Sequence, residues 1–177
     1  MQDASFGGNA IVADDRAVIR DAVRTALGPT WCIYQASSGI EALDFARSTQ
    51  AGLVILDIMM EPLDGLETAA QIRRLEGYHA VPLVMLTAFD SQQNLRRARL
   101  AGADDIIAKP FTSHQLVSSV RRLLAARQDL AGAGQSRSHF ETAQDILNVY
   151  RKVDSVSVRR DFGFIEWLKA QRRDSLR

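Results

Sequence analysis

The sequence predicts a doubly wound α/β fold with a parallel sheet, and three observations support this. Five short apolar segments alternate with five amphipathic segments between Ala10 and Arg127. The third apolar segment, residues 53–56, has no polar alternation, which is typical of a strand buried on both faces. Polar residues directly follow four of the five apolar segments, at the edge where open α/β sheets place their ligand sites. Such an alternation favours a parallel sheet with right-handed crossovers.

The first two units have clear boundaries. Residues 10–13 form the first expected strand, and residues 16–27 place apolar side chains at the spacing of one helix face. Gly28 and Pro29 end this helix. Residues 31–36 form the second strand. Ser38, with Glu41 three residues later, then has the pattern of a capping box at the start of a second helix.

The other three units follow the same order. The buried strand over residues 53–56 leads to a helix that Gly65 opens. Residues 81–86 form the fourth strand and lead to a helix over residues 91–101, which Gly102 ends. Residues 105–108 form the fifth strand, and Thr112 caps a last helix that runs to about residue 127.

The composition is that of a globular protein without a strong general affinity for polyanions. Of 177 residues, 46% are hydrophobic and 24% charged, and the formal net charge is +1. The start shows no signal-peptide pattern and no apolar run approaches ~20 residues, so we expect a cytoplasmic protein and no membrane partner. Cys32 is the only cysteine, which excludes an internal disulfide, and its strand position predicts a small buried side chain.

The polar residues at the strand ends comprise three carboxylates, one hydroxyl and one ammonium, which could together form one binding site. Asp14 and Asp15 follow the first strand, Asp57 the third, Thr87 the fourth and Lys109 the fifth. Right-handed crossovers would bring them to one edge, where clustered carboxylates have raised pKa values or require a cation. A few hard oxygen ligands suit Mg²⁺. Taken singly, each residue has an ordinary alternative as a turn, cap, strand or loop residue, but their joint occurrence favours a site.

These residues carry a resemblance. The pattern Asp14-Asp15, Asp57, Thr87-Ala88 and Lys109-Pro110-Phe111 resembles the receiver domain of two-component response regulators over residues 9–127. The resemblance implies a flavodoxin-like, five-stranded sheet of order 2-1-3-4-5. It also implies that Asp57 accepts a phosphoryl group from a histidine kinase or a histidine phosphotransfer protein.

The resemblance assigns the other site residues as well. Mg²⁺ would be held by Asp14, Asp15, Asp57 and the backbone carbonyl of Met59. Thr87 and Lys109 would contact the phosphoryl group, Ala88 would leave space for it, and a cis peptide would precede Pro110.

Four positions depart from the family pattern or vary within it. Glu61 stands where receivers usually have proline, with Pro62 one residue later, and Ile106 replaces the usual switch aromatic. Met59 and Phe89 would border the path of the hydrolytic water, and both are apolar. Because neither side chain orients a water by hydrogen bonding, we expect a long-lived phosphorylated state.

The sequence outside the resemblance has a leader at residues 1–8, an expected linker at 128–138 and a helical extension at 139–177. The last helix could also run into the linker. Residues 128–177 carry nine basic and seven acidic side chains, a net charge of +2, too mild to predict nucleic-acid binding. The apolar helix faces of the extension predict packing on the receiver, on a second copy or on a partner.

Two classes of function follow. The first is a response regulator, not an enzyme, that switches an output protein or its own dimerisation through the last-helix face or the extension. The second is a degenerate receiver that acts as a phosphorylation-independent interaction scaffold. A magnesium-dependent phosphatase is less favoured, because no separate general acid is evident near Asp57.

Overall fold

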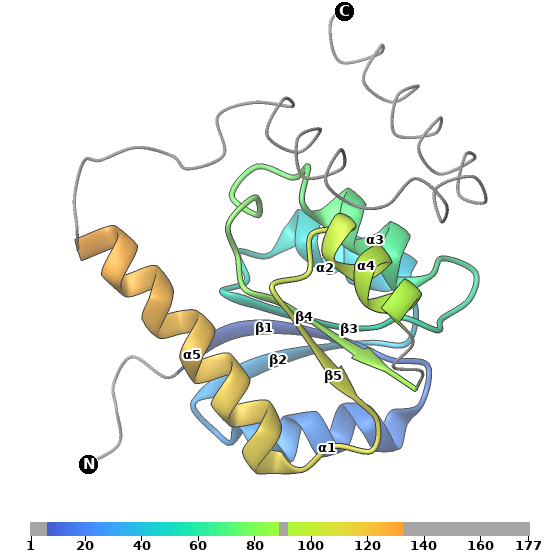
Figure 1. The fold of residues 1–177 in the computed structure, drawn as a ribbon, viewed down its shortest axis with the longest axis horizontal. Helices are drawn as coiled ribbons and strands as arrows, with labels where there is room; N and C mark the ends of the chain where they lie inside the picture. The colour runs from blue at the N-terminus through green and yellow to red at the C-terminus, as the bar shows by residue number, and fades with distance from the viewer. Residues whose placement is uncertain (1–6, 89–91, 133–177) are drawn as a thin grey trace, which may run out of the picture. The chain divides into compact units, whose positions relative to one another are not determined.

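The structure is a computed structural model that describes residues 7–88 and 92–132, and it shows a parallel sheet with helices on both faces (Figure 1). The strands are β1 (Gly8–Ala13), β2 (Trp31–Ala36), β3 (Leu53–Asp57), β4 (Leu83–Thr87) and β5 (Asp105–Ala108). The helices are α1 (Ala17–Leu27), α2 (Gly39–Ser48), α3 (Gly65–Ile72), α4 (Gln92–Leu100) and α5 (Ser113–Gly132). The predicted alternation of five strands and five helices is confirmed.

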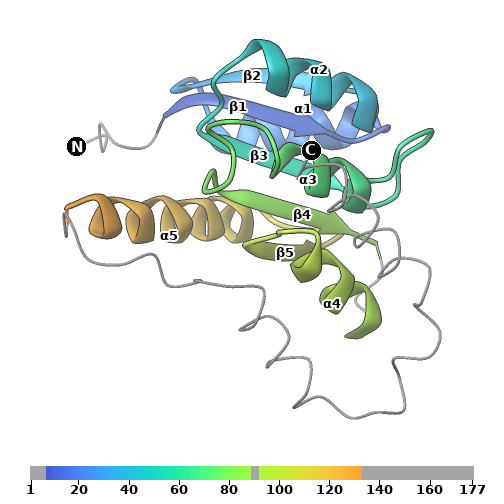
Figure 2. The same cartoon turned by 90° about the horizontal axis from the view of Figure 1, so that it is seen from above.

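The sheet has the order β2-β1-β3-β4-β5, and all four strand pairs are parallel (Figure 2). In the register, Ala13 lies beside Leu56 of β3, and Thr87 lies beside Ala108 of β5. All five strands therefore end at one edge, as right-handed crossovers require. The predicted fold class and strand order are confirmed.

The core lies in two layers, one on each face of the sheet. Helices α2, α3 and α4 cover one face, and α1 and α5 cover the other (Figure 1). Successive residues of a strand point to opposite faces, so Ile11 packs beneath the first group of helices and Val12 beneath the second. Every residue of β3 is buried, which explains why its sequence lacks polar alternation.

The helix starts confirm the two capping predictions. Ser38 Oγ accepts a hydrogen bond from the Glu41 N–H at 3.3 Å. The Glu41 carboxylate reaches back one residue further than in the usual capping box, to the backbone N–H of Ser37 at 2.7 Å. At α5, Thr112 Oγ1 accepts from the Gln115 N–H at 3.2 Å, and Gln115 Oε1 accepts from the Thr112 N–H at 2.8 Å.

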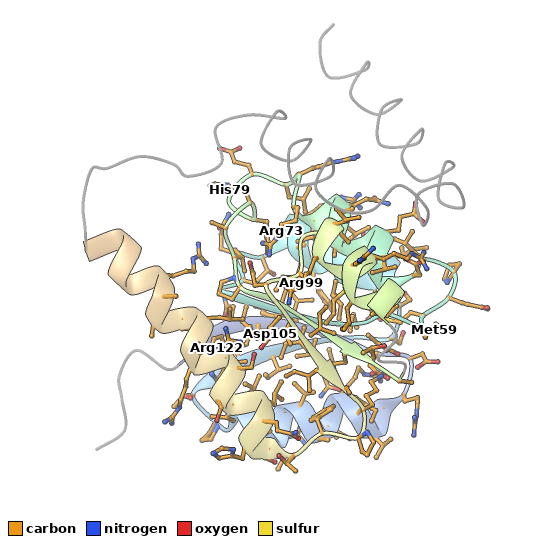
Figure 3. The ribbon with its side chains drawn as sticks, in the orientation of Figure 1. Met59, Arg73, His79, Arg99, Asp105 and Arg122 are labelled. Atoms are coloured by element: carbon orange, nitrogen blue, oxygen red, sulfur yellow. The ribbon has the colours of Figure 1, made fainter. Side chains whose placement is uncertain are left out.

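Arg73 connects two loops at the edge of the sheet where the strands begin. Arg73, which follows α3, donates to the carbonyl oxygens of Gly102 at 2.7 Å, Tyr78 at 2.9 Å and Val81 at 2.5 Å. It also forms an ion pair with Asp104 at 2.8 Å. One guanidinium thus joins the loop before β4 to the loop before β5 (Figure 3).

Three expectations need correction or refinement. Cys32 is exposed, not buried, because β2 is an edge strand with a neighbouring strand on one side only. The fourth strand begins at Leu83 instead of residue 81; Pro82, just before it, has no N–H for a sheet ladder. Helix α5 continues to Gly132, so the first part of the expected linker is helical.

The remaining expectations on chain organisation lie outside the described residues. These are most of the leader, Phe89, the rest of the linker and the helical extension. Among the described helices, none is long and apolar enough to cross a bilayer.

Candidate functional site

Three carboxylates meet at the edge where the strands end. Asp14 directly follows β1, and Asp57 ends the neighbouring strand β3. Carboxylate oxygens of Asp14, Asp15 and Asp57 lie within 4.8 Å of one another. Asp14 is fully buried and Asp57 is 4% exposed, whereas Asp15 faces solvent. The predicted acidic cluster is therefore present, with two buried members and one accessible from solvent.

Lys109, the residue directly after β5, joins this cluster. Its ammonium lies 2.5 Å from Asp14 Oδ2 and 2.9 Å from Asp57 Oδ1, and its side chain is only 10% exposed. The Lys109 backbone N–H donates to the Thr87 carbonyl at 2.6 Å. The Lys109–Pro110 peptide is cis, as the resemblance implied.

The charges of this site do not balance. Burial raises the pKa of Asp57 above its ordinary value, and the neighbouring Asp14 carboxylate acts in the same direction. The hydrogen bond and charge of Lys109, together with the Met59 N–H, act to lower that pKa. Three carboxylates face one ammonium, so the ionised site carries a net charge of −2, which one divalent cation would neutralise. The oxygen-only donor set fits Mg²⁺.

The residues expected around the phosphoryl position lie as follows. Thr87 ends β4 and is buried, and Ala88 after it is exposed. The Met59 side chain is 60% exposed and lies at the carboxyl edge of the sheet (Figure 3), with its N–H bonded to Asp57. Ile106 on β5 is partly buried and packs against the core on the α2–α4 side of the sheet.

The loop from β3 to α3 depends on a close backbone approach at Gly65. The Gly65 N–H donates to the Ile58 carbonyl at 3.0 Å. A Cβ at Gly65 would lie 1.9 Å from the backbone oxygen of Asp57, so no other residue fits without displacement of the backbone. Glu61 and Pro62, which depart from the family pattern, lie exposed in this loop, and the peptide between them is cis.

Sequence reasoning missed one residue beside the acidic pair. Arg20 of α1 donates from Nη1 to the carbonyl oxygens of Asp14 at 2.7 Å and Asp15 at 3.4 Å. Its Nε donates to Gln35 Oε1 on β2 at 3.3 Å. A signal was present, because helical side chains lean toward the helix N-terminus and Arg20 lies one turn into α1.

Comparisons with known proteins agree with this geometry. The family model described as "Response regulator receiver domain" matches residues 10–121. The chain is 36% identical to the response regulator MprA of Mycolicibacterium vanbaalenii over 169 residues, which cover 92% of this chain and 72% of that protein. It is 30% identical to the protein PilG of Pseudomonas aeruginosa over 122 residues, 68% of this chain and 90% of PilG.

The solved structures to which this chain is similar are also response regulators and receiver domains. The chemotaxis response regulator CheY4 of Vibrio cholerae is 26% identical with a TM-score of 0.63, over 66% of this chain and 98% of that structure. The receiver domain of the sensor histidine kinase PA1611 from Pseudomonas aeruginosa is 25% identical with a TM-score of 0.60, over 67% of this chain and 98% of that structure. Its title describes a magnesium ion coordinated in the active-site cleft.

Proposed function

This chain belongs to the response regulator receiver family, and we propose that its Asp57 accepts a phosphoryl group from a histidine kinase or a histidine phosphotransfer protein. The observation that carries the proposal is the convergence of Asp14, Asp15, Asp57 and Lys109 at one edge of the sheet. On the same grounds we assign the receiver to residues 9–127.

Asp57 is the nucleophile in this proposal. One of its carboxylate oxygens forms a bond to phosphorus, and the bond from phosphorus to the imidazole nitrogen of the donor breaks. The bonding electron pair stays on that nitrogen. The donor is thereby released as an imidazole, which exchanges protons with solvent. The buried position of Asp57 at the end of β3 excludes much of the water that would compete for the donor.

Lys109 and the metal site balance the incoming charge. Because Lys109 already contacts both Asp14 and Asp57, its ammonium is within reach of an oxygen on a phosphoryl group attached to Asp57. Asp14, Asp15, Asp57 and the Met59 carbonyl would hold Mg²⁺, which supplies charge neutralisation at the phosphoryl oxygens. The magnesium described for the related PA1611 receiver supports this assignment.

The output would start at Thr87, whose hydroxyl we propose as a donor to the phosphoryl group, with Ala88 leaving space beside it. Ile106 has no ring and no hydroxyl, so its response to phosphorylation is a change of packing against the core and not of a hydrogen bond. The α5 face or the C-terminal extension would then bind an output protein or a second copy. A cytoplasmic location stays a prediction.

The proposal is tested by intact mass after treatment with acetyl phosphate and Mg²⁺. We expect the wild-type protein to gain the mass of one phosphoryl group and Asp57→Asn to gain none. Asp44→Asn, a matched change at an exposed carboxylate on α2, should label like the wild type. Absence of labelling in the wild type, with Mg²⁺ present, would favour the phosphorylation-independent scaffold instead.

A further inference from the structure

Arg20 makes contacts that bear directly on the acidic pair. Its guanidinium spans the turn between β1 and α1, with Nη1 on the carbonyls of Asp14 and Asp15 and Nε on Gln35 of β2. The side chain is partly buried, so the bonds to the Asp14 carbonyl and to Gln35 are partly shielded from bulk water, whereas the longer bond to the Asp15 carbonyl is exposed. One residue therefore fastens the segment that carries two of the three carboxylates to the neighbouring strand.

Asp15 has fewer described hydrogen bonds than Asp14, and its neighbours in the chain are held on both sides. Asp14 is held by its own backbone N–H on the Ala36 carbonyl at 3.2 Å and by its side-chain contacts with the Arg16 N–H at 3.0 Å and with Lys109. For Asp15, whose carboxylate faces solvent, the described hydrogen bond is the one from Arg20 to its carbonyl oxygen.

We infer that Arg20 is a positioning residue that holds the Asp14–Asp15 backbone in the geometry that binds the divalent cation. This inference rests on the proposed function, because it requires a metal at these carboxylates. The planar guanidinium suits the role, since it donates in two directions at once, toward the turn and toward Gln35. Groups that orient metal ligands without touching the metal typically change affinity about 10–100-fold when they are removed.

The charge of Arg20 has an effect opposite to that of its hydrogen bonds. A positive charge beside a cation site repels the cation, so removal of the charge alone would tighten Mg²⁺ binding. Loss of the hydrogen bonds would loosen the turn and weaken binding. The sign of the change in affinity therefore separates positioning from simple electrostatics. If Arg20 only held α1 against β2, its removal would lower the stability of the fold and leave the affinity for Mg²⁺ unchanged.

The test compares Arg20→Met and Arg20→Lys with Arg24→Met. Arg24 lies one turn further along α1 and makes an exposed ion pair with Asp21 at 3.4 Å, so its substitution removes the same charge without touching the turn. The dissociation constant of Mg²⁺ is measured by calorimetric titration at fixed ionic strength. The free energy of unfolding is measured in urea without metal.

We expect Arg20→Met to bind Mg²⁺ about tenfold more weakly than the wild type. Arg20→Lys should lie between the two, because a single ammonium keeps the charge but not both directions of donation. Arg24→Met should bind as tightly as the wild type or slightly more tightly. If Arg20→Met binds Mg²⁺ as tightly as Arg24→Met, the inference is wrong, even if the Arg20→Met variant is less stable than the wild type.

Two further outcomes separate this inference from the proposed function. If the wild type does not bind Mg²⁺, or if Asp15→Ala binds it equally well, the metal site itself is wrong and the inference falls with it. If Arg20→Met does not fold, Arg20→Lys decides alone: weaker Mg²⁺ binding than the wild type supports positioning, and equal binding overturns it.

Discussion

Replacing Gly65 by alanine should damage both the fold and the site. A Cβ at this position would lie 1.9 Å from the Asp57 carbonyl oxygen, 2.8 Å from its carbonyl carbon and 3.0 Å from the Ile58 Cα. Ordinary van der Waals contact begins near 3.4 Å, so the start of α3 must move by about 1.5 Å away from β3. All three neighbours are backbone atoms, so no flexible side chain can yield in their place.

The expected loss of stability is roughly 3 kcal/mol, at the upper end of the range for overpacking. For a chain of this length that corresponds to a fall in the melting temperature of about 10 °C. Because the displaced loop carries Met59 and adjoins Asp57, the stabilisation that added Mg²⁺ provides should also shrink. Urea unfolding and thermal melting, each with and without Mg²⁺, measure both effects.

Gly52→Ala is the matched control. The nearest atom to a Cβ at Gly52 is the Asn9 carbonyl oxygen at 3.9 Å, so this variant should unfold within about 0.5 kcal/mol of the wild type. If Gly65→Ala were as stable as Gly52→Ala and kept the full effect of Mg²⁺, the argument from close backbone approach would be refuted.

Three further predictions concern charge, water access and the loop network. Asp57→Asn should raise the free energy of unfolding at neutral pH without metal, on the order of 1 kcal/mol. Because burial raises the Asp57 pKa in the folded state, the ionised carboxylate destabilises the fold at neutral pH. The stability gained by Asp57→Asn should therefore vanish as the pH falls toward the ordinary Asp pKa of 3.8. An equal gain in urea unfolding at neutral pH and near the ordinary Asp pKa would contradict this prediction. A Met59→Asn, Phe89→Glu double variant should lose its phosphoryl group roughly tenfold faster than the wild type, a difference of ~1.4 kcal/mol in the barrier, when phosphate release is followed with Mg²⁺ present; equal or slower release would show that these side chains do not limit hydrolysis. Arg73→Met should lower the free energy of unfolding by about 2–3 kcal/mol, because three backbone carbonyls lose the Arg73 donor and the Asp104 carboxylate keeps only the Leu83 N–H among its described donors. Arg97→Met on the exposed face of α4 should leave the free energy of unfolding unchanged, and similar urea midpoints for the two variants would count against the network.

Local sequence signals were sufficient for most of the fold. The second and fifth strands were predicted with their observed boundaries, because each is a short apolar run with a polar or glycine-containing turn on either side. The caps at Ser38 and Thr112 were predicted because a capping box depends on residues only three positions apart. The strand ends that form the site follow from the alternation of elements and the handedness of their connections.

Features that depend on long-range packing were not predicted. The exposure of Cys32 follows from the edge position of β2, which strand order decides and local pattern does not. Arg20 and Arg73 donate to backbone carbonyls, and a carbonyl has no residue-specific signature in the sequence. The length of α5 was underestimated for a local reason. Alanine and glycine after Arg127 indicate a linker and a helix about equally well.

The central claim is that a phosphoryl group is attached to Asp57 and to no other carboxylate of the cluster. The most direct measurement is reduction of the phosphorylated protein with borohydride, which converts an aspartyl phosphate into homoserine, followed by peptide mass spectrometry. We predict homoserine at position 57 only, and only in samples treated with both the phosphodonor and Mg²⁺. Homoserine at position 14 or 15, or a labelled protein with aspartate intact at position 57, would contradict the account.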